Sequence, residues 1–216
     1  MKRKTIKNPP KAKRTITSLR DTGYSAETAI ADIIDNSIEA EAATIEVILK
    51  EDITGDLILY CIDDGYGMDE KGIINALTLG SDEKDGANRL GKFGMGLKTA
   101  SLSCCKHISV ISRKEGSINA IKGILDLESL EDDFEITLCD PDQTEIDTLN
   151  EHTKGSGTII KWSKIDRILK KDYKRESAEA KALKKLHENI KDHLSLVFDK
   201  FLDKTLIGID DVFEET

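Results

Sequence analysis

The chain has 216 residues, of which 38% are hydrophobic, so it can bury one good core and a single domain is expected. Its formal net charge of −9 argues against a surface that binds nucleic acid through bulk electrostatics. No apolar stretch approaches the ~20 residues of a bilayer-spanning helix, and no signal-type apolar segment follows the basic N-terminus. We therefore expect a cytoplasmic protein without membrane contact.

Residues 1–17 are expected to form a flexible basic arm, because the only basic cluster of the sequence lies there and such clusters are more often solvated than structured. A helix is predicted after this arm. Ser25 is an N-cap residue by type, Glu27 lies in the first turn, and apolar residues then recur at helical spacing to about Ala43.

Two strands and a second helix are predicted next. Alternation in residues 44–50 and the apolar run of residues 57–62 are typical of strands, and a turn joins them at residues 54–56. The second helix is expected over residues 68–79. The polar, glycine-containing residues 80–92 form a loop that is long enough to be a candidate lid.

The second half of the chain mixes strands with charged connections. A short helix is expected over residues 96–103, and strands are expected over residues 107–113, 117–125, 134–139 and 158–162. The acidic residues 127–133 and 140–154 are interpreted as surface connections. Beyond residue 163 a charged helical segment carries apolar side chains on one face, from Ala178 to Phe201.

These elements predict the α/β class, as a two-layer α/β sandwich in which helices cover a mixed sheet. The expected organisation is the arm over residues 1–17, one domain over residues 18–163 and a helical extension over residues 164–216. The cysteines lack Cys-x-x-Cys spacing and are interpreted as small buried hydrophobic residues in a reducing compartment: Cys61, Cys104, Cys105 and Cys139.

Asp32 and Asn36 are candidate functional residues on the first helix. They lie four residues apart, on one side of the helix and at the border of its apolar arc, so we expect both to be half-shielded. A carboxylate there can serve a water molecule, and an amide oxygen can serve a hard cation such as Mg²⁺. The alternative is an ordinary solvated face formed with Asp35 and Glu39.

A glycine turn follows the strand that ends near Ile62. Its sequence is Asp63-Asp64-Gly65-Tyr66-Gly67, and a carboxylate at a strand end can accept a hydrogen bond from the amino group of a base. Glycines let the backbone approach a flat ring closely. The alternative is a common Asp-Gly hairpin turn.

A second glycine-rich segment leads directly into the predicted helix at residues 96–103. In Gly91-Lys92-Phe93-Gly94-Met95-Gly96, exposed amides and the positive helix end can bind phosphates, and Lys92 and Lys98 add charge. Neither a Walker loop nor a Rossmann fingerprint is present, since Gly-Lys-Ser/Thr is absent and no strand precedes it. Taken alone, the segment could equally be a flexible linker.

Together the three segments resemble the ATP site of the GHKL superfamily, which comprises gyrase, a heat-shock chaperone, histidine kinases and MutL. The resemblance rests on Ala-Ile-Ala-Asp-Ile-Ile-Asp-Asn-Ser-Ile-Glu-Ala, on Asp-x-Gly-x-Gly and on Gly-x-Phe-Gly-x-Gly-Leu-Lys, and it runs from about Ser18 to Ser163. These motifs are most similar to those of MORC-like ATPases, including bacterial ones. It implies a Bergerat-type ATP-binding fold with ATP and Mg²⁺ as ligands.

The resemblance also implies roles for individual residues. Asn36 would bind magnesium, Asp63 would accept from the adenine amino group, and Met68 would line the base pocket. The amides of Gly94, Met95, Gly96 and Leu97 would face the phosphates, and Thr158 would support the adenine-binding aspartate. The remaining residues of the implied nucleotide site are Ala40, Gly67, Lys84 in the lid, Lys92, Phe93 and Lys98.

One position departs from the family pattern. The general base is normally a glutamate four residues before the magnesium asparagine, and this chain has Asp32 there, one methylene shorter. The family's lysine from a following transducer domain has no counterpart, although residues 205–210 could begin such a domain. We therefore expect an N-terminal ATPase fragment or a stand-alone module of low activity.

The leading hypothesis is a slow ATPase in which ATP and Mg²⁺ order the lid and promote homodimerisation. The alternatives are a nucleotide-binding switch without turnover and a histidine-kinase-like phosphotransfer domain. DNA as a partner is implied by the resemblance alone, and the net acidity gives it no independent support.

Overall fold

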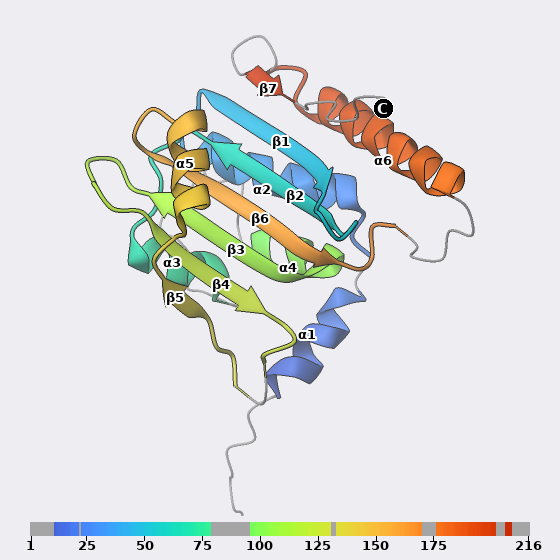
Figure 1. The fold of residues 1–216 in the computed structure, drawn as a ribbon, viewed down its shortest axis with the longest axis horizontal. Coiled ribbons are helices and arrows are strands. Elements are labelled where there is room, and N and C mark those ends of the chain that lie inside the picture. The colour runs from blue at the N-terminus through green and yellow to red at the C-terminus, as the bar shows by residue number, and fades with distance from the viewer. Residues whose placement is uncertain are drawn as a thin grey trace, which may run out of the picture.

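The computed structural model describes residues 11–21, 23–78, 96–130, 133–169, 176–201 and 206–208. Within these ranges seven strands form one sheet with the order β5-β4-β3-β6-β2-β1-β7 (Figure 1). The strands are β1 Thr44–Glu51, β2 Leu57–Asp63, β3 Cys105–Arg113, β4 Ile121–Asp126, β5 Thr137–Cys139, β6 Gly157–Ile165 and β7 Leu206–Gly208. The pair β1 and β7 is parallel and the other pairs are antiparallel, so the sheet is mixed, as predicted.

Helices lie on both faces of this sheet, but unequally. They are α1 Ala12–Arg20, α2 Ala26–Glu39, α3 Glu70–Leu77, α4 Gly96–Cys104, α5 Gln143–His152 and α6 Glu176–Val197. In Figure 1, α2, α3 and α4 lie behind the sheet, and α5 lies in front of it at one end. The predicted α/β class is confirmed. In the described part of the chain, no helix is long and apolar enough to cross a membrane.

Helix α2 forms for the reasons that its sequence suggests. The Ser25 side chain accepts a hydrogen bond from the Thr28 amide, and the apolar stripe of the helix, including Ile30, Ile33 and Ile34, is fully buried. The helix ends at Glu39 rather than near Ala43. The cause is a turn: Glu41 has a φ of 59°, a left-handed conformation that a right-handed helix cannot continue through.

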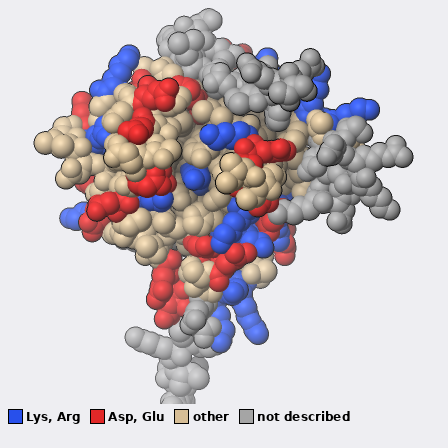
Figure 2. Space-filling model, in the orientation of Figure 1, with Lys and Arg blue, Asp and Glu red and all other residues tan. Residues whose placement is uncertain are grey.

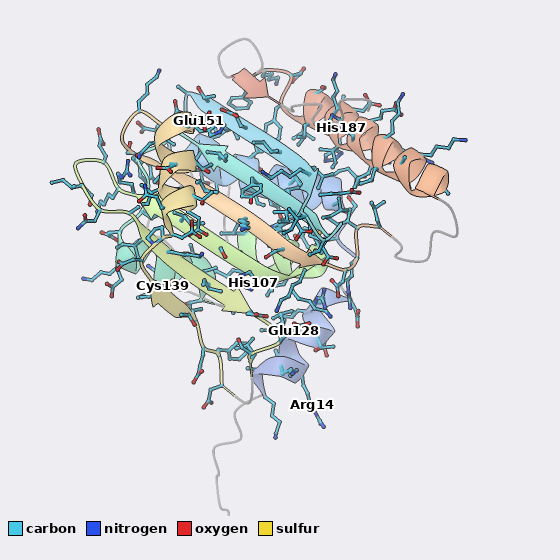
Figure 3. The ribbon with its side chains drawn as sticks, viewed as in Figure 1. Arg14, His107, Glu128, Cys139, Glu151 and His187 are labelled. Carbon is cyan, nitrogen blue, oxygen red and sulfur yellow. The ribbon has the colours of Figure 1, made fainter. Side chains whose placement is uncertain are left out.

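Alternation along β3 divides the core into two parts. Ile108 and Val110 belong to the main core beneath the helix layer, whereas Ile111 belongs to a smaller cluster with Ile159 and with Leu149 of α5. His107, labelled in Figure 3, has the same strand parity as Ile111, and its ring contacts the Asp126 carboxylate at 3.2 Å. Strand β3 is therefore covered on both faces where α5 lies.

Residues 140–154 were predicted to be a surface connection, and that prediction is wrong because they contain α5. A capping box starts this helix, in which Asp142 accepts from the Glu145 amide and the Glu145 side chain accepts from the Asp142 amide. Glu145 also pairs with Lys122 of β4 at 2.5 Å, and Leu149 is fully buried. Few apolar residues are needed here, because the helix covers only one end of the sheet.

Residues 12–17, expected in the flexible arm, belong instead to α1. Ala12 and Ile16 are buried, and the Arg20 guanidinium donates to the Leu102 carbonyl of α4 at 2.6 Å and also pairs with Asp166. Ala12 and Ile16 form an apolar stripe at helical spacing, which the surrounding basic residues made difficult to recognise in the sequence. The exposed Arg14, labelled in Figure 3, lies on this helix.

The bounds of other elements also differ from the predicted ones. Residues 117–120 precede β4 rather than belonging to it, and β5 begins at Thr137 rather than at Phe134. Cys139, expected to be buried, is exposed and lies on the edge strand β5, where Figure 3 labels it. Cys61, Cys104 and Cys105 are buried as predicted.

Helix α6 packs against α2, and four apolar side chains of α6 and one just beyond its end are buried: Leu183, Leu186, Ile190, Leu194 and Phe198. Val197 and Phe201, expected on the buried face, are 45% and 39% exposed. The extension over residues 164–216 is not helical throughout, since β7 pairs with β1 at the edge of the sheet.

Candidate functional site

Asp63, the last residue of β2, is a buried carboxylate of the predicted site. It is 5% exposed, and both of its carboxylate oxygens accept hydrogen bonds, one from the Ser37 hydroxyl at 2.9 Å and one from the Gly65 amide at 3.1 Å. Burial raises the pKa of Asp63 to about 6, although these hydrogen bonds oppose the shift. A buried carboxylate with oriented oxygens can accept from a further donor of matching shape.

Neighbouring backbone packs closely around the turn after Asp63. Its glycines are required because there is no room for a side chain. A Cβ on Gly65 would stand 2.6 Å from the Ala40 carbonyl oxygen, and one on Gly67 would stand 2.0 Å from that of Arg113. Gly67 also has a φ of 64°, which favours glycine. Both the backbone conformation and the lack of space therefore exclude other residues at this position. The Tyr66 amide donates to Ala40 at 3.0 Å, which fixes the end of α2 against the turn.

A hydroxyl network supports the same turn from β3 and β6. The Met68 amide donates to the Ser112 hydroxyl at 2.7 Å, and that hydroxyl lies 3.0 Å from the Gly157 carbonyl and 2.8 Å from the Thr158 hydroxyl. Thr158 is directly opposite Asp63 in the β2–β6 register. The structure therefore brings together five residues of the predicted set from three separate segments: Ala40, Asp63, Gly67, Met68 and Thr158.

The second part of the predicted site lies on α2. Asp32 and Asn36 are both half-buried, as expected. The Asn36 side-chain nitrogen donates to the Asp32 carbonyl at 2.6 Å, so the amide oxygen is the atom that remains to face a cation. Burial raises the pKa of Asp32, and a hydrogen bond from Tyr24 opposes this shift. Burial and the neighbouring Asp32 charge raise the pKa of Asp35 in the same way.

Helix α4, with Leu97 and Lys98 in its first turn, packs against α2. Lys98 was expected to contribute charge toward phosphates, but it is 2% exposed and its ammonium donates to the Thr78 carbonyl beyond the end of α3. Gly96 is the first residue of the helix. The remaining residues of the predicted phosphate loop and lid lie outside the described part of the chain: Lys84, Lys92, Phe93, Gly94 and Met95.

Two residues of this site were not identified from the sequence, Ser37 and Ser112. Each carried a signal, because each is a polar residue at a core-facing position of its element. Ser37 continues the stripe of Ile30, Ile33 and Ile34 on α2, and Ser112 continues the alternation of Ile108 and Val110 on β3. A hydroxyl in such a position needs a buried partner, and that partner is Asp63 for Ser37 and the Met68 amide for Ser112.

The donor set fits a magnesium-bound nucleotide. At the β2 end, a buried acceptor lies beside backbone that only glycine permits, which suits a flat base with an amino group. On α2, an amide oxygen and half-buried carboxylates suit a hard cation that keeps most of its ligands from water and phosphate. Among the described residues, no group of three or more His, Cys, Asp or Glu residues could hold a metal by itself.

Comparison with known proteins gives a consistent result. A family model described as "Histidine kinase-, DNA gyrase B-, and HSP90-like ATPase" matches residues 24–158. "ATPase MORC2B" of Mus musculus is 31% identical over 97 residues, which cover 43% of this chain and 10% of that protein. "ATPase morc-1" of Caenorhabditis elegans is 30% identical over 93 residues, covering 43% and 11%.

A plant relative matches a longer segment. "Protein MICRORCHIDIA 2" of Arabidopsis thaliana is 32% identical over 124 residues, which cover 53% of this chain and 20% of that protein. The chain thus spans between a tenth and a fifth of the length of these relatives.

Proposed function

Since this chain belongs to the histidine kinase-, DNA gyrase B- and HSP90-like ATPase family, we propose that it binds ATP with Mg²⁺ and hydrolyses the ATP slowly. The observation that carries this proposal is the Asp63 carboxylate, 5% exposed and held by Ser37 and the Gly65 amide beside a tight glycine turn. Burying a carboxylate costs folding free energy, and groups buried in this way cluster at functional sites, where a ligand uses them.

At the base end, Asp63 accepts from the adenine amino group. Both carboxylate oxygens are already oriented, so adenine meets an acceptor whose direction is fixed before binding. Met68 lines the base pocket, and the Ser112 hydroxyl holds its amide in place. Thr158 supports the turn from β6 through the same hydroxyl.

At the phosphate end, Asn36 offers its amide oxygen to Mg²⁺, and the first amides of α4 at Gly96 and Leu97 face phosphate oxygens. When bound, Mg²⁺ neutralises charge on the β- and γ-phosphates. The Asn36 nitrogen donates to the Asp32 carbonyl, so the amide oxygen is the atom that would hold the metal.

Asp32 is the proposed general base. Its raised pKa makes it a better proton acceptor than an exposed aspartate, because a base works best when its pKa approaches the working pH. Its side chain is short, so we propose that it holds the attacking water less well than a glutamate and that turnover is slow. A nucleotide-binding switch without turnover is the second candidate, and the short side chain of Asp32 is the observation that favours it.

We further propose that ATP closes residues 80–92 over the site and promotes homodimerisation. DNA remains a partner by family resemblance only. On the face shown in Figure 2, basic and acidic side chains are interspersed instead of forming one basic patch, so this face gives DNA binding no added support.

Phosphate release and ATP affinity should be measured together in wild type and two variants. Wild type should release phosphate slowly, Asp32→Asn should lose that release while keeping its ATP affinity, and Asp32→Glu should release phosphate faster. Tight ATP binding without release in wild type and in Asp32→Glu would replace the ATPase by the nucleotide switch. Unchanged release in Asp32→Asn would assign the base role to another residue, with Asp35 and Glu39 of α2 the candidates.

A further inference from the structure

The front face of the sheet carries a tyrosine beside two lysines, on the part that α5 does not cover. In Figure 1, α5 lies over one end of this face. Tyr60 of β2 is half-buried beyond it, and its ring centroid lies 4.9 Å from the Lys50 ammonium and 5.6 Å from the Lys161 ammonium. The strand register explains this arrangement, because Lys161 of β6 lies directly opposite Tyr60 and Lys50 of β1 lies diagonally from it.

These two lysines differ from their neighbours in charge pairing. In the part of the chain that the structure describes, neither Lys50 nor Lys161 forms an ion pair, and both contact the Tyr60 ring. Three lysines of β3, β4 and β6 do pair with carboxylates: Lys106 with Glu128 and Asp166, Lys122 with Glu145, and Lys164 with Asp126 and Glu128. Two ammonium groups around one ring repel each other, so an anion bound beside them would be stabilised.

Apolar side chains form the centre of the same surface. Ile48, directly opposite Tyr60, and Ile58, two residues before it on β2, are half-buried and lie on the same face. Ile48 and Tyr60 pack against the small cluster beneath α5. We call this surface the open-face patch, with an apolar centre of three side chains and one lysine on each flanking strand: Ile48, Ile58, Tyr60, Lys50 and Lys161.

We propose that the open-face patch binds a short acidic segment of a partner protein, in which an apolar side chain lies between two carboxylates. Alternate residues of an extended segment share a face, and residues four apart span about 13 Å. The order carboxylate, any residue, apolar, any residue, carboxylate therefore places the apolar side chain on Tyr60. The carboxylates then pair with Lys50 and Lys161. This binding requires no nucleotide, because the Asp63 carboxylate lies outside the patch.

A single strand of nucleic acid is the competing ligand, since lysine and aromatic side chains also bind phosphates and bases. Such a strand needs cations along its length. The same face instead carries Asp126, paired with His107 at 3.2 Å, and acidic side chains are interspersed across it in Figure 2. A short acidic segment needs only the two lysines that lack an ion pair, so the charges favour it.

The test measures fluorescence anisotropy of a labelled peptide, Glu-Ser-Leu-Ser-Glu-Ser-Leu-Ser-Glu. Wild type should bind it saturably, and a peptide with glutamine in place of glutamate should bind roughly tenfold more weakly. Lys50→Gln and Lys161→Gln should each weaken binding roughly threefold. Lys71→Gln is the matched control, because it removes the same charge from an exposed lysine of α3, behind the sheet, and should leave the affinity unchanged.

Two further readouts locate the peptide on the protein. Its backbone amide chemical-shift changes should gather on β1, β2 and β6 around Tyr60 and spare the turn after Asp63. Replacing leucine by serine in the peptide should weaken binding severalfold, because the contact with the apolar centre is lost. Tyr60→Phe should keep the affinity within twofold, because that contact uses the ring and not the hydroxyl.

The results that would overturn the proposal are distinct from any failure of ATP binding. Equal weakening by Lys71→Gln would show that net charge alone attracts the peptide. Lack of saturable binding by wild type, or shift changes confined to the turn after Asp63, would remove the open-face patch as the binding surface. A single-stranded oligothymidine that binds more tightly than the peptide, with the same dependence on Lys50 and Lys161, would assign the patch to nucleic acid instead.

Discussion

The base end of the site holds a carboxylate that is 5% exposed with both oxygens partnered, whereas the phosphate end presents Asp32 and Asn36 half-buried on one helix. Backbone from α2, β3 and β6 encloses the Asp63 turn, and a Cβ at either of its glycines would overlap a carbonyl oxygen. In the proposed function, recognition of the base is therefore built into the fold, whereas the phosphate end depends on a cation and on water.

Enclosure of the base end predicts a large cost for any side chain in the turn. Gly67→Ala should lower the free energy of unfolding by about 3 kcal/mol or more, because it combines a left-handed φ with a rigid carbonyl at 2.0 Å. Gly55→Ala is the matched control, with a φ of 80° and nothing within 4 Å of the added Cβ. Denaturant unfolding that gives equal losses would show that the enclosure contributes nothing.

Burial of Asp63 should appear as pH-dependent stability. The folded pKa of about 6 lies above the ordinary value of 3.8, so the folded state holds its proton over a window in which the unfolded state has lost it. Stability from this group is therefore complete below pH 3.8 and lost as pH rises through 6, by about 3 kcal/mol in total. Without nucleotide, Asp63→Asn should lack this loss; a constant difference between the two proteins from pH 4 to 7 would contradict the burial.

Base recognition should fail selectively when Asp63 is removed. Asp63→Ala should weaken ATP binding by ~1–3 kcal/mol, or roughly ten- to a hundredfold. Inosine triphosphate lacks the amino group, so it should bind wild type more weakly than ATP does. Asp63→Ala should bind inosine triphosphate and ATP equally well. Calorimetry that finds an undiminished preference for ATP in Asp63→Ala would remove adenine recognition from this residue.

Support from Ser37 should matter less. Ser37→Ala removes one of two donors to Asp63 and should cost about 1 kcal/mol of ATP affinity, roughly fivefold. Ser18→Ala is a suitable control, because the exposed Ser18 hydroxyl donates to the Arg14 carbonyl within α1 at 3.1 Å, away from Asp63. Equal affinities in wild type and Ser37→Ala would show that the Gly65 amide alone orients the carboxylate.

The two ends also differ in what the sequence could predict. Asp32, Asn36 and Asp63 lie in contiguous motifs, so element type and spacing were enough to place them. Ser112 was harder, because its partner Met68 is 44 residues away and the two come together only when both β3 and β2 pair with β6. Contacts of this kind depend on which strands pair, which periodicity does not determine.

Helix α5 shows the same limit in the fold. Its sequence buries few apolar residues, since it covers one end of the sheet, and its charged side chains bond to each other and to β4. The capping box at Asp142 and Glu145 was readable as a helix start, but the acidic composition favoured a loop. Helix α1 was missed for a similar reason, because its basic residues surround only two buried apolar side chains.

The most direct test of the account is calorimetric titration of ATP into wild type and Asn36→Ala, each with Mg²⁺ and with EDTA. The proposed site predicts that Mg²⁺ tightens ATP binding by wild type, that Asn36→Ala loses this gain, and that both proteins bind equally in EDTA, because Asp63 recognises the base without the metal. Absence of ATP binding in wild type would contradict the site as a whole. An equal gain from Mg²⁺ in both proteins would contradict the division of the site into a base end at Asp63 and a magnesium end at Asn36.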